Sequence, residues 1–598
     1  MLAYNHNDHA LKVKFFAIRI LLVISVLIYV VSWSYITISR FYSLNSLIYD
    51  LGLYMERSWE IWNVPMGASQ YIFILFQSGI IYLVFPLSLP QSYPLLLVVQ
   101  SFLIGVCAIP VFYISNYFIK DDYSSLFISL SLLIYFPLAG VNWYDLHYQV
   151  YFIPLFLFAF YFYVKDKWVI SFILMILSGL VRYPYIAFPL LFSLVYLLDT
   201  FYLKYKKEII STGKIKFLVS LLIFSSAFLA LSQLFLETHG LVLAGDIHAS
   251  SFQPLTININ NKVTTVILYL MPFLFFPLFS RRSLPLLLPY FSLMFITNFF
   301  GYVYPTSIMF QYSTAVVPFI FIGTIESISK LSRISESKRP SEINSPYRKK
   351  LPRLISIIVL IMVIILALFY EPYGPLNSST EANFNLENSL HPNYSEYNDL
   401  VRIVSLIPEN DPNILTQYNL PEIVPRELGP NPFFYITAVT LPYNLSYEQP
   451  NGNWIAANIT YVLADYNSSF YYFSQAYPFN YSMSSVISRL ETSGDFGVLA
   501  ESGPFILLKR DYNGLPLIYN PVKIYRSSSD LRYFNGPFLV HNGTAFANYS
   551  HTQLPLVIQL DSFEHYDFVL YPGVYNFTIK LKTSLAIYTT MLYLEYFR

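Results

Sequence analysis

The chain has 598 residues; 55% of them are hydrophobic, 12% are charged, and the formal net charge is +1. This composition excludes an ordinary soluble enzyme and offers no basic surface for nucleic acid, and it is typical of a polytopic membrane protein. The single cysteine, Cys107, excludes a disulfide framework and a cysteine-based metal site.

The N-terminal stretch is polar and carries Lys12 and Lys14, and an apolar run over residues 16–38 follows it. The run is long enough to cross a bilayer and lacks a small-residue cleavage site. We predict an uncleaved signal anchor with a cytoplasmic N-terminus.

The first outer loop, residues 39–92, begins with a segment whose apolar residues Leu53 and Ile61 recur at helical spacing. The same segment carries Trp59 and Trp62, and tryptophan is enriched at membrane interfaces. The pattern predicts an amphipathic helix on the membrane surface.

Asp50 stands at the start of this predicted helix, beside Tyr49 and shortly before Glu56. One interpretation is that Asp50 caps the helix, because Asp accepts hydrogen bonds from free N–H groups there. The other is a catalytic carboxylate that takes a proton from a hydroxyl substrate, with Tyr49 and Glu56 as substrate-binding neighbours.

Eleven further apolar segments follow the first, and most are near the ~20 residues that span a bilayer. Their ranges are about 71–88, 94–118, 124–140, 150–164, 168–182, 184–202, 217–236, 263–280, 283–300, 311–329 and 354–371.

Basic residues concentrate in alternate linkers, namely Lys165–Lys167, Lys204–Lys216, Arg281–Arg282 and Lys330–Arg353. The linkers 141–149, 237–262 and 301–310 are nearly free of Lys and Arg. The positive-inside rule therefore places the first set in the cytoplasm and the second set outside.

The outer linker 142–149 is short and dense in groups that can bond a phosphate or a sugar. Asp145, His147 and Gln149 are the substrate-binding candidates. A histidine in a loop is often merely solvated, but the two flanking segments hold this loop near the membrane boundary.

Arg182 closes an apolar run and precedes Tyr183-Pro184-Tyr185. An ionisable residue at the edge of a span is a functional candidate, and a lipid phosphate is the natural partner of an outer arginine. The alternative is that Arg182 snorkels to the headgroups. Tyr312, in the last outer linker, is a further binding candidate.

The outer linker 237–262 contains Glu237, His239, Asp246 and His248. Their spacing is too loose to specify a metal site, so we predict no metal and no cofactor, with a divalent metal as the minor alternative.

After residue 371 the long apolar runs stop, and short β-branched or aromatic stretches appear between turns. We predict a mixed α/β domain over residues 372–514 and a β-rich, sandwich-like domain over 515–598. The predicted helix is Glu396–Leu406, and the predicted strands include Phe434–Thr440, Val498–Lys509 and Tyr575–Leu581.

All nine Asn-X-Ser/Thr sequons lie after residue 371. They begin at Asn377, Asn393, Asn444, Asn458, Asn467, Asn480, Asn542, Asn548 and Asn576. N-glycosylation occurs only outside the cytoplasm, so the clustering predicts a C-terminal ectodomain. Chance in an Asn- and Ser-rich segment is the alternative.

An outer C-terminus and a cytoplasmic N-terminus require an odd number of spans, whereas twelve segments were counted. The segment 71–88 is the best candidate for a non-spanning hairpin, because Pro65 and Gly67 precede it, prolines follow it, and no basic residue flanks it. The predicted fold is thus an α-helical membrane domain, residues 1–371, with eleven spans, N-terminus in and C-terminus out.

Several motifs together resemble a family of predicted prokaryotic membrane proteins, domain of unknown function 2079. In the membrane domain they are Tyr49-Asp50-Leu51-Gly52, the stretch Pro86 to Pro110, Asp145-Leu146-His147-Tyr148-Gln149, and Gln311-Tyr312-Ser313 with Pro318. In the ectodomain they are Leu406-Ile407-Pro408, Arg426, Ala464-Asp465-Tyr466 and Gly503 to Lys509. The resemblance covers about residues 1–510.

The family has the layout of the GT-C glycosyltransferase superfamily, whose members take a sugar from a polyprenyl-phosphate donor on the outer membrane face. The resemblance implies that Asp50 is the catalytic base, and that the partners are membrane lipid, a polyprenyl-phosphate sugar and a glycan or glycoprotein acceptor. It further implies a multi-pass protein of an archaeal plasma membrane and cell envelope. The chain departs from the family pattern at Val181–Pro184, which replaces a Lys-Glu-Asp motif, and at Gln149, where Glu is usual.

Two other functions are compatible with the sequence. The chain could be a non-catalytic envelope or glycan-binding scaffold whose spans only anchor the ectodomain. A lipid or solute transporter is the second alternative, but no matched pair of Gly/Pro-broken halves marks the inverted repeats of such proteins.

Overall fold

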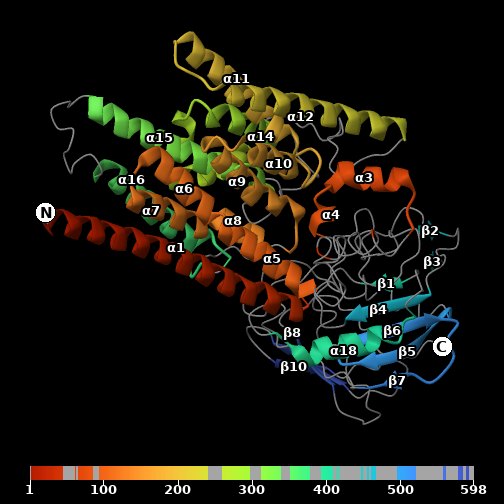
Figure 1. Cartoon of the computed structure of the whole chain (residues 1–598). Helices are drawn as coiled ribbons and strands as arrows, with labels where there is room; N and C mark the ends of the chain where they lie inside the picture. The colour runs from red at the N-terminus through yellow and green to blue at the C-terminus, as the bar shows by residue number, and fades with distance from the viewer. Residues whose placement is uncertain are drawn as a thin grey trace. The chain divides into compact units, whose positions relative to one another are not determined.

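The computed structural model describes the residues that follow, and every structural statement below refers to them. They are 2–44, 51, 61, 65–84, 93–143, 145–239, 259–296, 311–337, 350–372, 374–376, 392–408, 414–416, 446–448, 454–456, 460–465, 494–519, 556–560, 577–582 and 587–590. The chain divides into two compact units (Figure 1). The first contains Met1–Ile38 and Arg57–Ser379, and the second contains Ser39–Glu56 and Thr380–Arg598.

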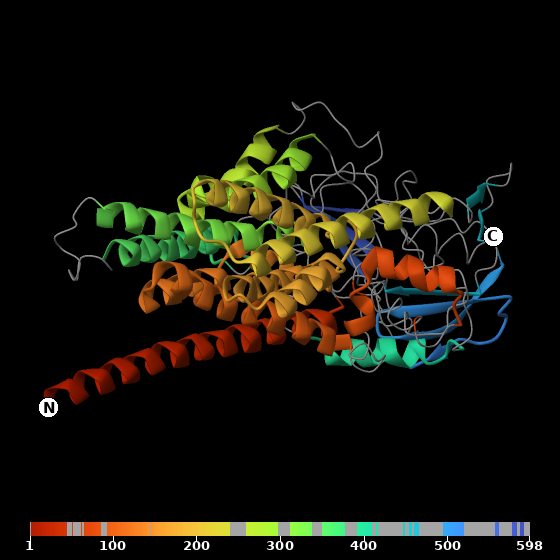
Figure 2. The ribbon, with the colours of Figure 1, turned by 45° about the horizontal axis from the view of Figure 1, so that its top comes forward.

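The chain opens with one long helix, α1 (Leu2–Tyr42), seen in Figure 2, which begins well before the predicted apolar run 16–38 and ends about one turn after it. Hydroxyl side chains inside it bond back to its own carbonyls. Ser25 donates to the Leu21 carbonyl at 2.9 Å and Thr37 to the Trp33 carbonyl at 3.0 Å. These bonds satisfy polar groups that would otherwise be costly in an apolar surrounding.

Two short helices occupy the segment that was predicted not to span. They are α3 (Ala68–Ser78) and α4 (Ile81–Val84). The 11 residues of α3 reach only about 16 Å, whereas the apolar core of a bilayer is about 30 Å thick. This length agrees with a non-spanning hairpin, although the total of eleven spans stays a prediction.

The next four helices form two broken pairs. The first pair is α5 (Tyr93–Val106) with α6 (Ala108–Ile119), and the second is α7 (Asp122–Leu133) with α8 (Phe136–Trp143). Each break lies just before a proline, Pro110 or Pro137, which cannot donate a backbone hydrogen bond to the preceding turn.

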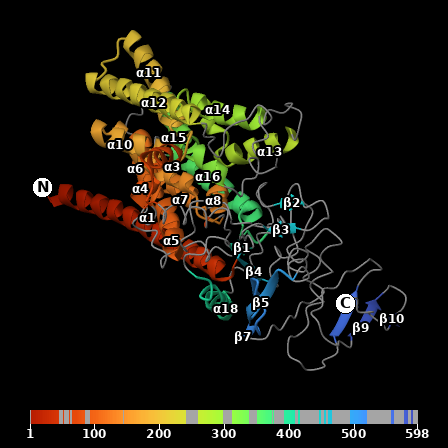
Figure 3. The ribbon, with the colours of Figure 1, turned by 90° about the vertical axis from the view of Figure 1, so that its right-hand side faces the viewer.

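The remaining helices of the first unit follow as a series of hairpins. They are α9 (Phe152–Val164), α10 (Trp168–Gly179), α11 (Ala187–Tyr205), α12 (Thr212–Thr238), α13 (Ile259–Leu270), α14 (Ser283–Ile296), α15 (Val317–Ser337) and α16 (Lys350–Tyr370). Two short 3-10 helices, η6 (Met271–Phe273) and η7 (Phe276–Phe279), connect α13 to α14. Figure 3 shows α13 beside α14, which it contacts.

Six of the described helices are long and apolar enough to cross a membrane. They are Phe16–Tyr42, Pro94–Ile119, Asp122–Trp143, Ala187–Tyr205, Thr212–Thr238 and Lys350–Tyr370. Three shorter apolar helices accompany them, Tyr148–Val164, Trp168–Gly179 and Ser283–Phe295. The first unit is therefore a helical domain of a multi-pass membrane protein.

Aromatic rings fill the interior where α9, α11 and α15 meet. The ring of Phe156 packs against Phe319 with a centroid distance of 4.9 Å and against Phe192 at 5.7 Å. Between membrane helices such van der Waals packing, and not exclusion of water, holds the helices together.

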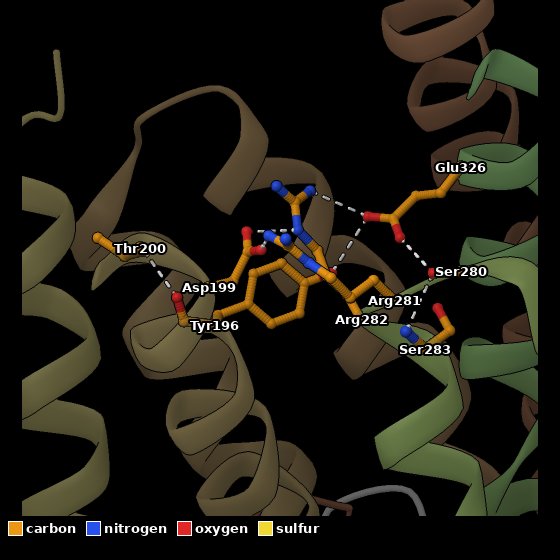
Figure 4. A network of polar contacts seen from close by, with 8 residues as sticks. All are labelled: Tyr196, Asp199, Thr200, Ser280, Arg281, Arg282, Ser283 and Glu326. Atoms are coloured by element: carbon orange, nitrogen blue, oxygen red, sulfur yellow. Dashed lines mark hydrogen bonds and ion pairs between the residues drawn. The ribbon is translucent and has the colours of Figure 1, made fainter. Parts of the chain in front are cut away.

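The basic linkers gather at one end of the helical unit, here called the basic end. Figure 4 shows a polar network at this end, in which Arg281 and Arg282 converge on Asp199 of α11. Arg282 donates to Asp199 at 2.8 Å and to Glu326 of α15 at 3.2 Å, and Ser280 donates to Glu326 at 2.6 Å. The two arginines and two carboxylates neutralise one another, so these four residues carry no net charge. Their bonds fix the turn before α14 to α11 and α15.

A second ion pair at this end joins α16 to α7. Arg353 donates to both carboxylate oxygens of Asp121 at 2.7–3.1 Å, and Asp121 also caps α7 by accepting from the Ser124 N–H at 3.0 Å. Burial raises the pKa of Asp121, but the bonds from Arg353 and Ser124 outweigh it and hold that pKa below its usual value.

The second unit contains a five-stranded sheet with the order β1-β4-β6-β5-β7. Its strands are β1 (Ile414–Thr416), β4 (Tyr461–Asp465), β5 (Phe496–Ser502), β6 (Phe505–Arg510) and β7 (Leu517–Ile518). The pairs β1–β4 and β5–β7 are parallel, and the pairs β4–β6 and β5–β6 are antiparallel. Helix α18 (Tyr394–Val404), close to the predicted helix, packs on β5 and β6, where Ser502 donates to Asp399 at 2.7 Å.

Two smaller sheets complete the second unit. One is the antiparallel pair β2 (Ser446–Glu448) and β3 (Trp454–Ala456). The other has the order β10-β9-β8, with β8 (Leu556–Leu560), β9 (Phe577–Lys582) and β10 (Ile587–Thr590).

The structure corrects two details of the predicted ectodomain. The stretch Val498–Lys509 was expected to be one strand, but it divides at Gly503, whose φ of +55° allows the tight turn between β5 and β6. Leu517–Ile518 was assigned to the β-rich second domain, but it pairs with β5 of the first sheet. The predicted strand Phe434–Thr440 lies outside the described residues.

Candidate functional site

The most polar buried segment of the helical unit is the loop after α8, residues 145–147, and the following 3-10 helix η4 (Tyr148–Tyr151). Asp145 is 2% exposed, His147 1% and Gln149 3%. His147 is therefore not a solvated loop histidine, which was the alternative considered from the sequence. Buried polar groups of this kind are costly unless they are bonded, so the loop is held by specific partners.

Helix α5 supplies those partners through two consecutive residues. Gln100 donates to the Asp145 carbonyl at 2.8 Å and accepts from the His147 N–H at 3.1 Å. Ser101 donates to the side-chain oxygen of Asn142, at the end of α8, at 3.1 Å. Gln100 thus fixes the turn of the loop to α5, and Ser101 fixes the end of α8 to α5.

Asp145 has an unusual backbone conformation, with φ of +43°. Its N–H donates to the Trp143 carbonyl at 3.1 Å, and the Val150 N–H donates to the His147 carbonyl at 3.1 Å. A left-handed conformation outside glycine is uncommon, and such residues persist where the surrounding structure enforces them.

Arg182 lies in the turn between α10 and α11 and is partly exposed. Residues 77–80 hold this turn in place: the Ile80 N–H donates to the Leu180 carbonyl at 2.9 Å, and Ser78 donates to the Val181 carbonyl at 2.6 Å. The Tyr183 N–H donates to the Gln77 carbonyl at 2.8 Å. The segment 71–88 therefore supports a predicted site residue, a role that its sequence did not reveal.

The turn of Arg182 is joined to the segment of Tyr312. The hydroxyls of Tyr185 and Thr314 lie 2.8 Å apart, and Thr314 belongs to η10 (Gln311–Ala315), which contacts η4. The Tyr185 ring also packs on Phe152, the first residue of α9, with a centroid distance of 5.2 Å. The structure thus brings the loop of Asp145 and His147, the turn of Arg182 and the segment of Tyr312 to one end of the helical unit, opposite the basic end.

Glu371, directly after α16, is an acidic residue that the sequence analysis missed. It interacts electrostatically with the Tyr29 hydroxyl, to which the side-chain amide of Asn142 donates at 3.5 Å. Burial raises the pKa of Glu371 to about 7. A carboxyl that titrates near neutrality can hold or release a proton close to Tyr29. The only sequence signal was an acidic residue immediately after the last apolar run.

Lys262 is a second missed residue at this end. It is 1% exposed, and its ammonium group donates to the Phe295 carbonyl, near the C-terminal end of α14, at 2.9 Å. A cation at a helix C-terminus interacts favourably with the exposed carbonyls and the helix dipole. Its bond holds the start of α13 to the end of α14.

Several predicted residues cannot be placed. Asp50, Tyr49, Glu56, Asp246 and His248 lie outside the described residues, as do all sequon asparagines except Asn393. Asn393 is exposed and caps α18, accepting from the Glu396 N–H at 3.1 Å. Within the described ranges, no group of three or more His, Cys, Asp or Glu is placed to hold a metal ion.

A multi-pass helical unit with a buried polar loop and a second unit built on a mixed sheet define a polytopic helical membrane protein. Residues 40–506 match the family described as predicted membrane protein DUF2079, and the chain belongs to that family. No curated protein sequence matches it.

The solved structures that resemble the chain include two membrane enzymes. The apo oligosaccharyltransferase of Archaeoglobus fulgidus is 12% identical with a TM-score of 0.37, over 74% of this chain and 69% of the other. ArnT from Cupriavidus metallidurans bound to undecaprenyl phosphate is 12% identical with a TM-score of 0.42, over 81% of this chain and 97% of the other. Neither likeness assigns an activity to this chain.

Proposed function

We propose that the protein is a membrane glycosyltransferase of the GT-C type, which transfers a sugar from a polyprenyl-phosphate donor to a hydroxyl acceptor on the outer membrane face. The observation that carries the proposal is the buried loop of Asp145 and His147, held rigidly at the same end of the helical unit as the turn of Arg182. Polar groups that are fixed and shielded from water interact strongly with developing charge.

Arg182 is the group best suited to the donor phosphate. It is partly exposed, and its backbone is fixed by the bonds that α3 and the residues after it make to residues 180–183. A guanidinium binds a phosphate through two parallel hydrogen bonds and keeps its charge at any physiological pH. In the reaction the bond between the sugar carbon and the phosphate oxygen breaks, its electrons stay on the phosphate, and Arg182 stabilises that charge.

The other residues bind the sugar and activate the acceptor. Asp50 removes the proton from the acceptor hydroxyl as its oxygen attacks the sugar carbon. Asp145 accepts hydrogen bonds from the sugar hydroxyls, Gln149 accepts from them and donates to them, and His147 donates to the phosphate. Tyr49, Glu56 and Tyr312 complete the substrate-binding set.

The topology of the proposal is eleven spans, with the N-terminus in the cytoplasm and residues 372–514 and 515–598 outside a plasma membrane. Its support is the separation of charge in the helical unit: the basic linkers lie at one end and the polar loop at the other. The acceptor is then a glycan or glycoprotein of the cell envelope.

Donor consumption tests this function. The purified full chain in lipid nanodiscs is incubated with a mixed pool of polyprenyl-phosphate sugars and envelope glycoprotein, and the lipids are analysed by mass spectrometry. The proposal predicts loss of one donor with release of free polyprenyl phosphate. An unchanged pool, with intact protein and a range of acceptors, would instead favour the envelope scaffold.

A further inference from the structure

The side chain of Gln100 satisfies one acceptor and one donor of the loop backbone at the same time. Its amide nitrogen donates to the Asp145 carbonyl at 2.8 Å, and its amide oxygen accepts from the His147 N–H at 3.1 Å. Only one orientation of the amide satisfies both groups, and Gln100 is 0% exposed, so water cannot replace it without reorganisation.

These two bonds bracket the strained residue. Asp145 has φ of +43°, a conformation that residues other than glycine rarely adopt. The two bonded groups are its own carbonyl and the N–H two residues on. A strained backbone persists only where other contacts enforce it, and strain of this kind clusters at functional sites. The two hydrogen bonds from Gln100 of α5, called the clamp below, are such contacts.

We propose that Gln100 is a positioning residue, which holds residues 145–147 in the strained turn and so fixes the directions in which Asp145 and His147 leave the backbone. The inference rests on the proposed function in one respect: the two side chains are those that bind the sugar-phosphate donor. Gln100 itself acts through the loop and does not contact the donor.

The neighbouring residue provides a matched control. Ser101 bonds Asn142, which lies before the loop at the end of α8, and not the turn itself. Ser101→Ala therefore removes a buried hydrogen bond of the same helix without releasing residues 145–147. Gln100→Met removes both clamp bonds at nearly constant volume, and Gln100→Glu keeps an acceptor for the His147 N–H.

The first test needs no substrate. Amide hydrogen exchange is measured by mass spectrometry on the full chain in nanodiscs, on peptides that cover residues 144–150. Gln100→Met should speed exchange at the His147 amide by about tenfold or more, since that N–H loses its buried acceptor. Gln100→Glu should have a smaller effect, and Ser101→Ala should leave this amide unchanged. Unchanged exchange in a folded Gln100→Met protein would overturn the clamp.

The second test uses the donor consumed by the wild type. Gln100→Met should raise the KM for that donor about tenfold with a smaller change in kcat, Gln100→Glu should retain more of the affinity, and Ser101→Ala should match the wild type. Faster exchange with an unchanged KM would show that the clamp is structural and would overturn the positioning role. Absence of turnover in the wild type would contradict the proposed transferase function. The hydrogen-exchange result would still decide whether Gln100 holds residues 145–147.

Discussion

The hydroxyls of Tyr185 and Thr314 lie 2.8 Å apart, although 129 residues separate them in the chain. Tyr185 follows Arg182 in the turn between α10 and α11, and Thr314 follows Tyr312 in η10, which contacts the 3-10 helix after His147. One hydrogen bond therefore links the turn of Arg182 to the segment of Tyr312.

Replacing Arg182 tests the phosphate-binding role. Arg182→Ala should raise the KM for the polyprenyl-phosphate sugar at least tenfold, because a bidentate charged partner of the phosphate is lost. Arg182→Lys should recover part of the affinity, since a lysine keeps the charge but not the paired geometry. Steady-state kinetics with purified donor measure both. A donor KM that is the same in Arg182→Ala as in the wild type would rule this role out.

The buried carboxyl of Glu501 should make the second unit sensitive to pH. Glu501 is 1% exposed, neither of its carboxylate oxygens has a hydrogen-bond partner, and burial raises its pKa from 4.5 to about 7. The folded state then holds the proton more tightly than the unfolded state. Its contribution to stability is full below pH 4.5 and is lost as the pH rises to about 7, a loss of about 3 kcal/mol.

Thermal unfolding of the full chain between pH 4.5 and 8 checks this expectation. The unfolding temperature of the second unit should fall with rising pH in the wild type and much less in Glu501→Gln. Asp495→Asn, an exposed carboxylate in the same unit, is the control and should retain the wild-type slope. Equal slopes in the wild type and Glu501→Gln would contradict the assignment.

The ion pair between Arg353 and Asp121 should stabilise the basic end. Arg353→Met leaves the Asp121 carboxylate, 3% exposed, without its cation, which we expect to destabilise the helical unit by about 2–3 kcal/mol. Lys330→Met, which removes an exposed cation from α15 of the same unit, should cost less than about 0.5 kcal/mol. Denaturation of the nanodisc-embedded protein compares the two, and equal effects would refute a specific pair.

The proposed topology can be tested by labelling. The native Cys107 is buried, so an introduced cysteine reports its own side of the membrane. Lys207→Cys, in the linker between α11 and α12, should resist a membrane-impermeant maleimide added to intact cells, whereas Ser395→Cys in α18 should react. Efficient reaction at position 207 would place the linker between α11 and α12 outside the cell and would contradict the proposed topology.

Glycosylation tests the outer position of the second unit independently. Asn393 is exposed, and its side-chain nitrogen, the atom that carries a glycan, donates to Glu396 at 2.7 Å. We expect glycans at Asn393 and at other sequons in a host that modifies its surface proteins. Glycopeptide mass spectrometry that finds all nine asparagines bare in such a host would count against an ectodomain.

Local patterns predicted much of this architecture. The apolar runs became helices, the predicted helix Glu396–Leu406 became α18, and the short segment 71–88 became two helices too short to span. The grouping of Asp145 with Arg182 at one end followed from charge alternation along the chain. Each of these predictions rests on the hydropathy or charge of residues that are close together in the sequence.

Contacts between distant segments were beyond such patterns. Gln100 is one polar residue in an apolar run, and only the loop 45 residues further on shows its purpose. The support of Arg182 by Ser78 spans 103 residues, and Glu371 gains its raised pKa from burial that no local pattern encodes. The turn at Gly503, by contrast, could have been read from Gly503-Pro504, because glycine and proline together mark a turn.

The most direct test of sugar transfer is the turnover of Asp50→Asn. The substitution is nearly isosteric but cannot accept a proton, so the purified variant should keep its expression, its unfolding temperature and its donor KD while losing at least about a thousandfold in the rate of donor consumption. Both proteins are assayed in nanodiscs with the same polyprenyl-phosphate sugar. Turnover of Asp50→Asn within a few-fold of the wild-type rate would contradict Asp50 as the base and, with it, the proposed mechanism of transfer.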